Sequence, residues 1–162
     1  MQRAIYAGTF DPFTNGHYDI VKQAAEIFDE LYIVIATNSN KKRTFKASDM
    51  IKAIQETVSE LDKNIQVLET SELVADFAKT LNCRYLIRGL RNPNDYYYEE
   101  NIAKINLELN SELTTVYFRA KNDIVSSSFI KEMLLYGKDV SKYVSAPVLR
   151  VIEENRGNSL NS

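Results

Sequence analysis

The sequence has few of the features that mark secreted or membrane-embedded proteins. Cys83 is the only cysteine, so no disulfide can form within the chain, and a reducing compartment is expected. No apolar run approaches the length that spans a bilayer, and residues 1–6 lead into a strand-like segment without the apolar core of a signal peptide. We therefore expect a cytoplasmic protein with no membrane partner.

Charge of one sign is also scarce. The formal net charge of the 162 residues is -2, which argues against a broad nucleic-acid-binding surface. The basic residues are clustered, however: four lie within residues 41–46, and Arg88 and Arg91 form a second pair. Local basic clusters in a slightly acidic chain favour a small anionic ligand over a long polyanion.

Two common nucleotide-binding motifs are missing. The chain contains neither the G-x-x-x-x-G-K-[ST] phosphate loop nor the G-x-G-x-x-G dinucleotide fingerprint. These absences argue against a P-loop kinase and against an ordinary NAD-dependent enzyme.

Apolar, strand-like runs alternate with helical patterns along the chain. The alternation predicts a single α/β domain over residues 1–155, a Rossmann-like, doubly wound and mostly parallel sheet with helices on both faces. The Gly/Ser/Asn-rich residues 156–162 are expected to form a disordered tail. The predicted strands are 3–7, 31–36, 65–68, 85–87 and 115–118, and the predicted helices are about 17–28, 48–58, 73–81, 94–109, 127–135 and 147–154.

Ligands of such folds bind beyond the carboxyl ends of the strands. The segment after the first strand, residues 8–17, contains two glycines and leads into a helix whose free N–H groups favour an anion. Thr14 and His17 are three residues apart and share a face of that helix. His17, the only histidine, could donate to a phosphate held there. The alternative is that it caps or packs the helix.

Three further segments follow predicted strands, and each has two interpretations. The basic residues after strand two form either a solvated loop or a mobile cation that closes on phosphate. Arg88 and Arg91 either bind phosphate or pair with Asp95, Glu99 or Glu100. The three serines at 126–128 either cap the next helix or present hydroxyl and N–H groups to phosphates. Their shared position at one edge favours phosphate binding.

Taken together, these residues resemble the phosphopantetheine adenylyltransferase family, over nearly the whole chain from Arg3 to about Glu153. Residues 14–17 are the T-x-G-H form of the motif of the wider nucleotidylyltransferase superfamily. Residues 86–91 read Leu-Ile-Arg-Gly-Leu-Arg, and the serines at 126–128 are followed by Lys131-Glu132. The family often has proline where this chain has Ala7, and its segment before the serines is longer, with an aromatic residue that is absent here.

The resemblance implies a role for each matching position. The implied catalytic residues are His17, Lys41 and Arg88. The residues implied to bind the phosphopantetheine substrate are Thr9, Lys41, Val74 and Arg88. The residues implied to bind ATP are Thr9, Phe10, His17, Gly89, Leu90, Arg91, Glu99, Asp123, Ile124, Val125, Ser126, Ser127 and Ser128.

The implied reaction transfers an adenylyl group from ATP to 4'-phosphopantetheine, giving dephospho-coenzyme A and pyrophosphate. Two polyanions must be aligned, so donors and cations are needed rather than a protein nucleophile, and no covalent enzyme intermediate is expected. The sequence shows no metal cage, so Mg²⁺ is expected to arrive with ATP. The resemblance also implies a homohexamer and feedback inhibition by coenzyme A.

Other functions are compatible with parts of this pattern. A cytidylyltransferase or a nicotinamide-nucleotide adenylyltransferase would use the same T-x-G-H chemistry, although residues 86–91 argue against both. A non-catalytic ATP-binding module would not need a second phosphate site at Lys41 and Arg88. A flavodoxin-like redox module is disfavoured by the basic residues at the strand ends.

Overall fold

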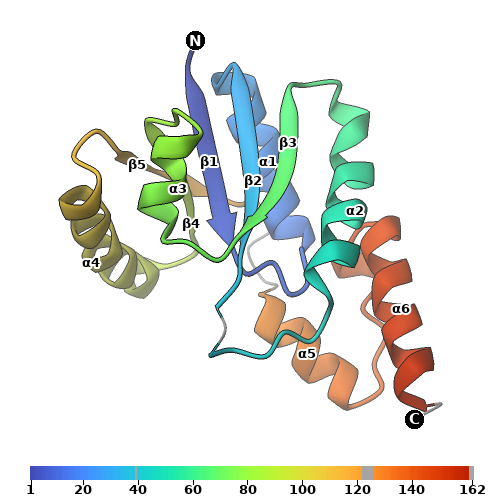
Figure 1. The fold of residues 1–162 in the computed structure, drawn as a ribbon. Coiled ribbons are helices and arrows are strands. Elements are labelled where there is room, and N and C mark those ends of the chain that lie inside the picture. The colour runs from blue at the N-terminus through green and yellow to red at the C-terminus, as the bar shows by residue number, and fades with distance from the viewer. Residues whose placement is uncertain (39, 122–125, 161–162) are drawn as a thin grey trace.

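A single parallel sheet forms the centre of the molecule (Figure 1). The computed structural model describes residues 1–38, 40–121 and 126–160. Its strands are β1 (Arg3–Gly8), β2 (Glu30–Ala36), β3 (Ile65–Thr70), β4 (Tyr85–Leu90) and β5 (Thr114–Arg119). They lie in the order β3-β2-β1-β4-β5, and every neighbouring pair is parallel.

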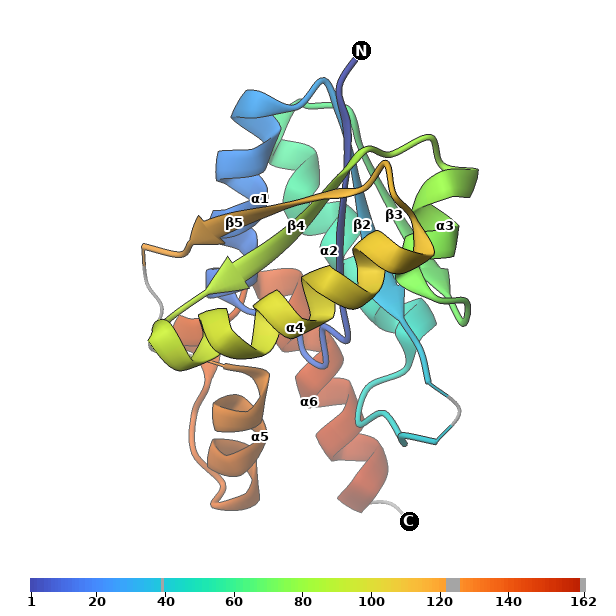
Figure 2. The same cartoon turned by 90° about the vertical axis from the view of Figure 1, so that its left-hand side faces the viewer.

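Helices cover the two faces of the sheet and its carboxyl edge (Figures 1 and 2). They are α1 (Asn15–Ile27), α2 (Ala47–Val58), α3 (Val74–Thr80), α4 (Pro93–Leu109), α5 (Ser127–Leu135) and α6 (Ala146–Leu160), with short 3-10 turns at Ser59–Leu61 and Ser141–Tyr143. The predicted α/β fold with helices on both faces of a parallel sheet is therefore confirmed. Within the described ranges, no helix is long and apolar enough to cross a membrane.

Alternate side chains of the strands point to opposite faces and build two cores. Tyr6 of β1 and Ile33 of β2 join a cluster with the apolar sides of α1, α2, α5 and α6. Ile5 and Val34, their neighbours in sequence, join a second cluster with Ala75 and Ala78 of α3. Because β1 and β2 are covered on both faces, their residues form continuous apolar runs.

The strand order reverses at β1, and this reversal positions the ligand crevice. The first two crossovers add β2 and β3 on one side of β1, and the chain then returns to place β4 on the other side. In open parallel sheets, ligands bind outside the carboxyl ends of the strands that flank such a reversal. The connections that follow β1 and β4 are therefore the ones that meet across the crevice.

The end of β4 differs from the sequence prediction. The apolar run suggested a strand ending at Ile87, with Arg88 and Gly89 just beyond it, but β4 continues to Leu90. Its extra residues pair with β5, Arg88 opposite Tyr117 and Gly89 opposite Phe118. Pairing with a neighbouring strand decides where a strand ends, and the apolar pattern of one segment does not record it.

The carboxyl-terminal helix is longer than predicted. Residues 156–160, expected to belong to a disordered tail, continue α6 to Leu160. The helix is anchored earlier along its length by the buried Val148 and Ile152, and it packs against α2. Once a helix is nucleated by packing, each added residue costs little, so a polar, Gly-containing end can remain helical.

Candidate active site

A cavity of about 320 Å³ opens at the carboxyl ends of β1 and β4. This volume is at the lower end of the range for small-ligand pockets. The residues predicted from the sequence that line it are Thr9, Phe10, His17, Arg88, Gly89, Leu90, Arg91, Glu99, Ser126 and Ser127. The turn after β1, the end of β4, the first turns of α4 and the start of α5 thus meet at one site.

Other predicted residues lie outside this lining. Lys41 is exposed in the connection after β2, Val74 is half-buried at the start of α3, and Ser128 is exposed in the first turn of α5. The backbone N–H and hydroxyl of Thr37 both donate to the Thr70 carbonyl (2.9 and 3.1 Å), which joins the ends of β2 and β3. The predicted Asp123, Ile124 and Val125 lie outside the described residues.

His17 has two functions in the first turn of α1. Thr14 is the N-cap: its hydroxyl accepts from the His17 backbone N–H (3.2 Å), while its own backbone N–H donates to Nδ1 of His17 (3.0 Å). This reciprocal arrangement is a capping box with histidine in the place usual for Glu or Gln. The capping alternative is therefore correct for Nδ1, and the same ring also lines the pocket.

The surroundings of His17 keep its ring uncharged. The imidazole stacks on Phe13 and meets the ring of Phe10 edge-on, with centroid separations of 5.5 and 4.9 Å. Burial, followed by the positive charges of Arg91 and Arg88, lowers its pKa from 6.5 to about 4. Because Nδ1 accepts a hydrogen bond, the single proton of the neutral ring resides on Nε2. His17 is thus a neutral N–H donor beside the cavity.

Arg88 is held by Glu99. Its Nε and Nη2 donate to the two carboxylate oxygens (2.7 and 2.8 Å), and Nη1 donates to the Ala7 carbonyl (2.9 Å). Burial alone would lower the pKa of Arg88, but the hydrogen bonds and charge of Glu99 raise it. One N–H on each terminal nitrogen remains for a ligand. The expected pairing with an acidic residue and the expected phosphate contact are therefore compatible.

Contacts within the protein also hold Arg91, Ser126 and Ser127. Arg91 pairs with Asp95, whose Oδ2 accepts from both the backbone N–H and Nε of Arg91 (3.0 and 3.1 Å). Ser126 caps α5 by accepting from the Phe129 N–H (3.1 Å), and the Ser127 hydroxyl donates to the Pro12 carbonyl (2.8 Å). The hydroxyls of Ser126 and Ser127 thus make structural contacts, and the start of α5 faces the pocket.

Sequence reasoning missed some of the lining. Asp95 and Tyr98 of α4 border the cavity beside Glu99. Helical spacing could have identified them. Asp95 lies four residues before Glu99 and three before Tyr98, and residues at these spacings share a face of a helix. Gly89 also has a packing role that was not expected, since a Cβ there would lie 2.6 Å from Cδ1 of Ile20. Its lack of a side chain lets β4 approach α1.

Comparisons with known proteins identify the class to which the chain belongs. The cytidylyltransferase-like family model matches residues 5–133, which places the chain among the nucleotidyltransferases. A solved structure from Vibrio parahaemolyticus, described as a candidate nicotinate-nucleotide adenylyltransferase, aligns with a TM-score of 0.69 over 95% of this chain and 93% of that one. Its sequence identity is only 18%, so it supports the fold.

Curated relatives narrow the class. The phosphopantetheine adenylyltransferase of Lactobacillus gasseri is 42% identical over 99% of this chain and 98% of its own length. The enzyme of that name from Lachnoclostridium phytofermentans is 40% identical over 94% of both chains. The chain belongs to the phosphopantetheine adenylyltransferase family.

The protonation of His17 can be measured directly, because it is the only histidine. Nitrogen-detected NMR of the free protein should show the Nε2–H tautomer and a pKa near 4. ATP should raise that pKa, since phosphate charge favours the imidazolium. On unfolding, the pKa of His17 should return to about 6.5. As the pH falls from that value to about 4, the unfolded chain binds the proton more readily than the folded chain, so the free energy of unfolding should decrease. A His17 ring that carries its proton on Nδ1 and has a pKa near the ordinary value would contradict its role as a neutral Nε2–H donor.

Proposed function

We propose that the chain transfers the adenylyl group of ATP to 4'-phosphopantetheine, giving dephospho-coenzyme A and pyrophosphate. The observation that carries this proposal is the meeting of His17, Arg88 and the start of α5 in one pocket of a chain about 40% identical to enzymes of that name. The pocket offers cations and N–H donors, which suit two phosphate-bearing substrates.

The family resemblance implies where the two substrates bind. ATP would lie along Gly89–Arg91 and the start of α5, with Thr9 and Phe10 beneath its phosphates. The phosphate of phosphopantetheine would bind between Arg88 and Lys41, with the pantetheine arm towards Val74. Arg88 lies within the cavity, whereas Lys41 and Val74 follow the neighbouring strands β2 and β3 at the same edge.

The chemistry needs alignment and charge stabilisation rather than a protein nucleophile. An oxygen of the acceptor phosphate attacks the α-phosphorus of ATP, the new P–O bond forms, and the bond to the leaving pyrophosphate breaks. The Nε2–H of His17 would donate to an α-phosphate oxygen as negative charge shifts onto it. Arg88, fixed by Glu99, would hold the attacking phosphate without having to reorganise during the reaction.

Magnesium would be bound mainly by the triphosphate. The described ranges contain no group of three or more His, Cys, Asp or Glu side chains that could hold a metal ion. The two pocket carboxylates, Glu99 and Asp95, are engaged with Arg88 and Arg91. When present, Mg²⁺ neutralises charge on the leaving pyrophosphate. The chain itself contributes the donors and cations around it.

The proposed activity is tested by pyrophosphate release. Purified protein should release pyrophosphate only when ATP, Mg²⁺ and phosphopantetheine are all present. Replacing the acceptor by nicotinamide mononucleotide, or the substrate pair by CTP and glycerol phosphate, provides the specificity controls. Equal turnover with either control would overturn the assigned acceptor. ATP binding without turnover of any acceptor would instead indicate a non-catalytic module.

Variants of His17 separate its cap from its chemistry. Glutamine is a usual capping-box residue at this position, so His17→Gln should keep the cap and the fold. It lacks the rigidly placed Nε2–H, and losing one such donor lowers kcat by about a hundred- to a thousandfold. His17→Ala should lose activity to a similar extent and also lower the melting temperature. ATP affinity, measured by calorimetry, should change little in both, because the interaction strengthens in the transition state. Near-normal turnover of folded His17→Gln would assign His17 to capping alone.

We also propose that the enzyme is a homohexamer located in the cytoplasm and inhibited by coenzyme A, as the family resemblance implies. Helix α4 carries exposed large side chains that a second copy could cover: Tyr97 is 71% exposed, Ile105 59% and Leu107 52%. Light scattering at micromolar concentration should give a mass near six chains, and Ile105→Lys should reduce it. A fully active monomer would refute the hexamer.

A further inference from the structure

We propose that Asp11 and Arg43 are positioning residues that hold the basic loop, residues 40–46, and its Lys41 against the phosphate-binding turn after β1. This role rests on the proposed function, in which Lys41 helps to bind the acceptor phosphate. Two residues of the basic cluster differ in their surroundings. Lys41 is exposed, whereas the side chain of Arg43 is only 17% exposed and makes contacts within the protein.

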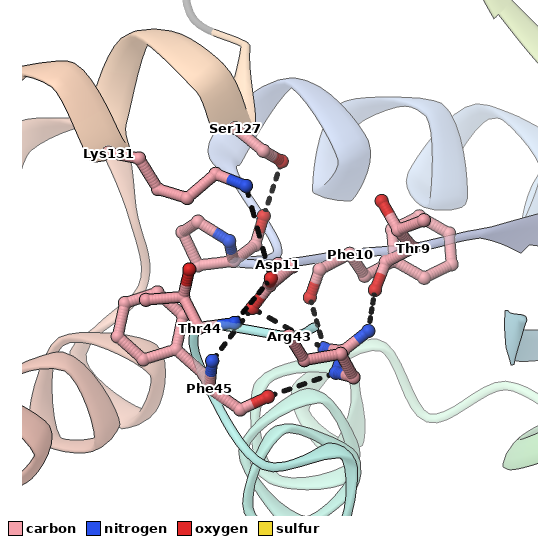
Figure 3. Close-up of polar contacts among 9 residues, drawn as sticks. Thr9, Phe10, Asp11, Arg43, Thr44, Phe45, Ser127 and Lys131 are labelled. Atoms are coloured by element: carbon pink, nitrogen blue, oxygen red, sulfur yellow. Dashed lines mark hydrogen bonds and ion pairs between the residues drawn. The ribbon is translucent and has the colours of Figure 1, made fainter. Parts of the chain in front are cut away.

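The carboxylate of Asp11 ties the turn to the loop (Figure 3). Its Oδ2 accepts from the backbone N–H of Thr44 (2.8 Å) and its Oδ1 from that of Phe45 (2.9 Å). Asp11 is only 5% exposed, and a buried carboxylate is tolerated only where hydrogen bonds and positive charges compensate it. Nη2 of Arg43 at 3.7 Å and Nζ of Lys131 at 3.9 Å supply those charges.

Arg43 makes the reverse connection, from the loop to the turn. Its Nη1 donates to the Thr9 carbonyl and its Nη2 to the Phe10 carbonyl, while Nε donates to the Phe45 carbonyl in its own loop (Figure 3). All three nitrogens of the guanidinium are therefore engaged with backbone. The planar fork satisfies three carbonyls at once, which the single ammonium of lysine cannot reproduce.

Lys41 lies between two fixed points. On one side, Thr37 is bonded to Thr70, and the Lys41 backbone N–H donates to the Asn38 carbonyl (3.0 Å). On the other side, the contacts of Asp11 and the buried ring of Phe45, which is 2% exposed, fix the loop to the core. The second anchor is therefore expected to limit how far the loop, and Lys41 with it, can move away from the turn.

The ATP side of the site has supports of its own. The turn after β1 is also held by the Thr14–His17 capping box and by Phe10, which is buried beside Tyr6 and Phe13. Arg91, on the ATP side, is oriented by Asp95. Loss of the Asp11–Arg43 connection should consequently impair use of the acceptor much more than ATP binding.

The test is a double-mutant cycle between Arg43 and Lys41, with pyrophosphate release and separate calorimetry of ATP and phosphopantetheine as readouts. Arg43→Gln should lower kcat/KM for phosphopantetheine on the order of tenfold to a hundredfold, as displaced binding groups do. Arg43→Lys should lie between this variant and the wild type, and Asp11→Asn should behave like Arg43→Gln. ATP affinity should stay within about twofold of wild type in all of these variants, well below the loss expected for the acceptor.

The decisive result is the coupling. If Arg43 acts by placing Lys41, adding Arg43→Gln to Lys41→Ala should cause little further loss, because coupled residues are not additive. Two controls isolate stability. Arg150→Gln removes a surface ion pair with Glu56, and Ile54→Val weakens the packing of α2 against the core. At temperatures well below the melting temperature of each variant, neither substitution should change kcat/KM.

The outcomes are distinct. A wild-type protein without turnover overturns the proposed function and this role with it. An active wild type in which the Arg43 and Lys41 losses multiply overturns the positioning role alone, as does an equal loss of ATP and acceptor affinity in Arg43→Gln. Non-additive losses confined to the acceptor support it. Faster hydrogen exchange of the Thr44 and Phe45 amides in Asp11→Asn would trace the effect to the second anchor of the loop.

Discussion

The site depends on satisfying the polar groups of one buried turn. The turn after β1 carries a nearly inaccessible carboxylate, Asp11, and carbonyl groups that lie outside any strand or helix. Buried groups of this kind must be hydrogen-bonded. The partners come from distant segments: Arg43, Thr44 and Phe45 from the loop after β2, and Ser127 from α5. The contacts that satisfy the turn are thus the contacts that assemble the pocket.

The charged groups of the pocket also have partners within the protein. Each arginine of the pocket is paired with a carboxylate from the next helix, Arg88 with Glu99 and Arg91 with Asp95, yet each guanidinium keeps N–H groups for a ligand. Pairing fixes the side chains before any substrate binds, so less conformational freedom is lost on binding. The paired carboxylates also reduce the repulsion between the two guanidinium groups. Such an arrangement suits a reaction in which two polyanions must be brought into line.

Much of this could be predicted from the sequence, and the failures have physical causes. Apolar runs and helical periods identified the five strands and six helices, because burial produces both patterns. The strand order and the extension of β4 could not be read, since pairing of Arg88 with Tyr117 depends on residues far away in the chain. The segments of the site were found through their position after strands. The partners of Asp11 and Arg43 were not, because an Asp-Pro pair reads only as a turn, and a loop arginine reads as one more solvated charge.

A neutral histidine is the donor that this arrangement can best accommodate. Packing between Phe10 and Phe13 fixes the ring, but it also removes water that would stabilise an imidazolium, and two arginines oppose the added charge. A protonated His17 would therefore cost desolvation and repulsion, whereas an uncharged Nε2–H costs little of either. In the proposed reaction, Arg88 would supply the full positive charge and His17 a directed hydrogen bond. The capping bond from Thr14 to Nδ1 fixes that direction, so one hydrogen bond sets the start of α1, the tautomer and the aim of the donor.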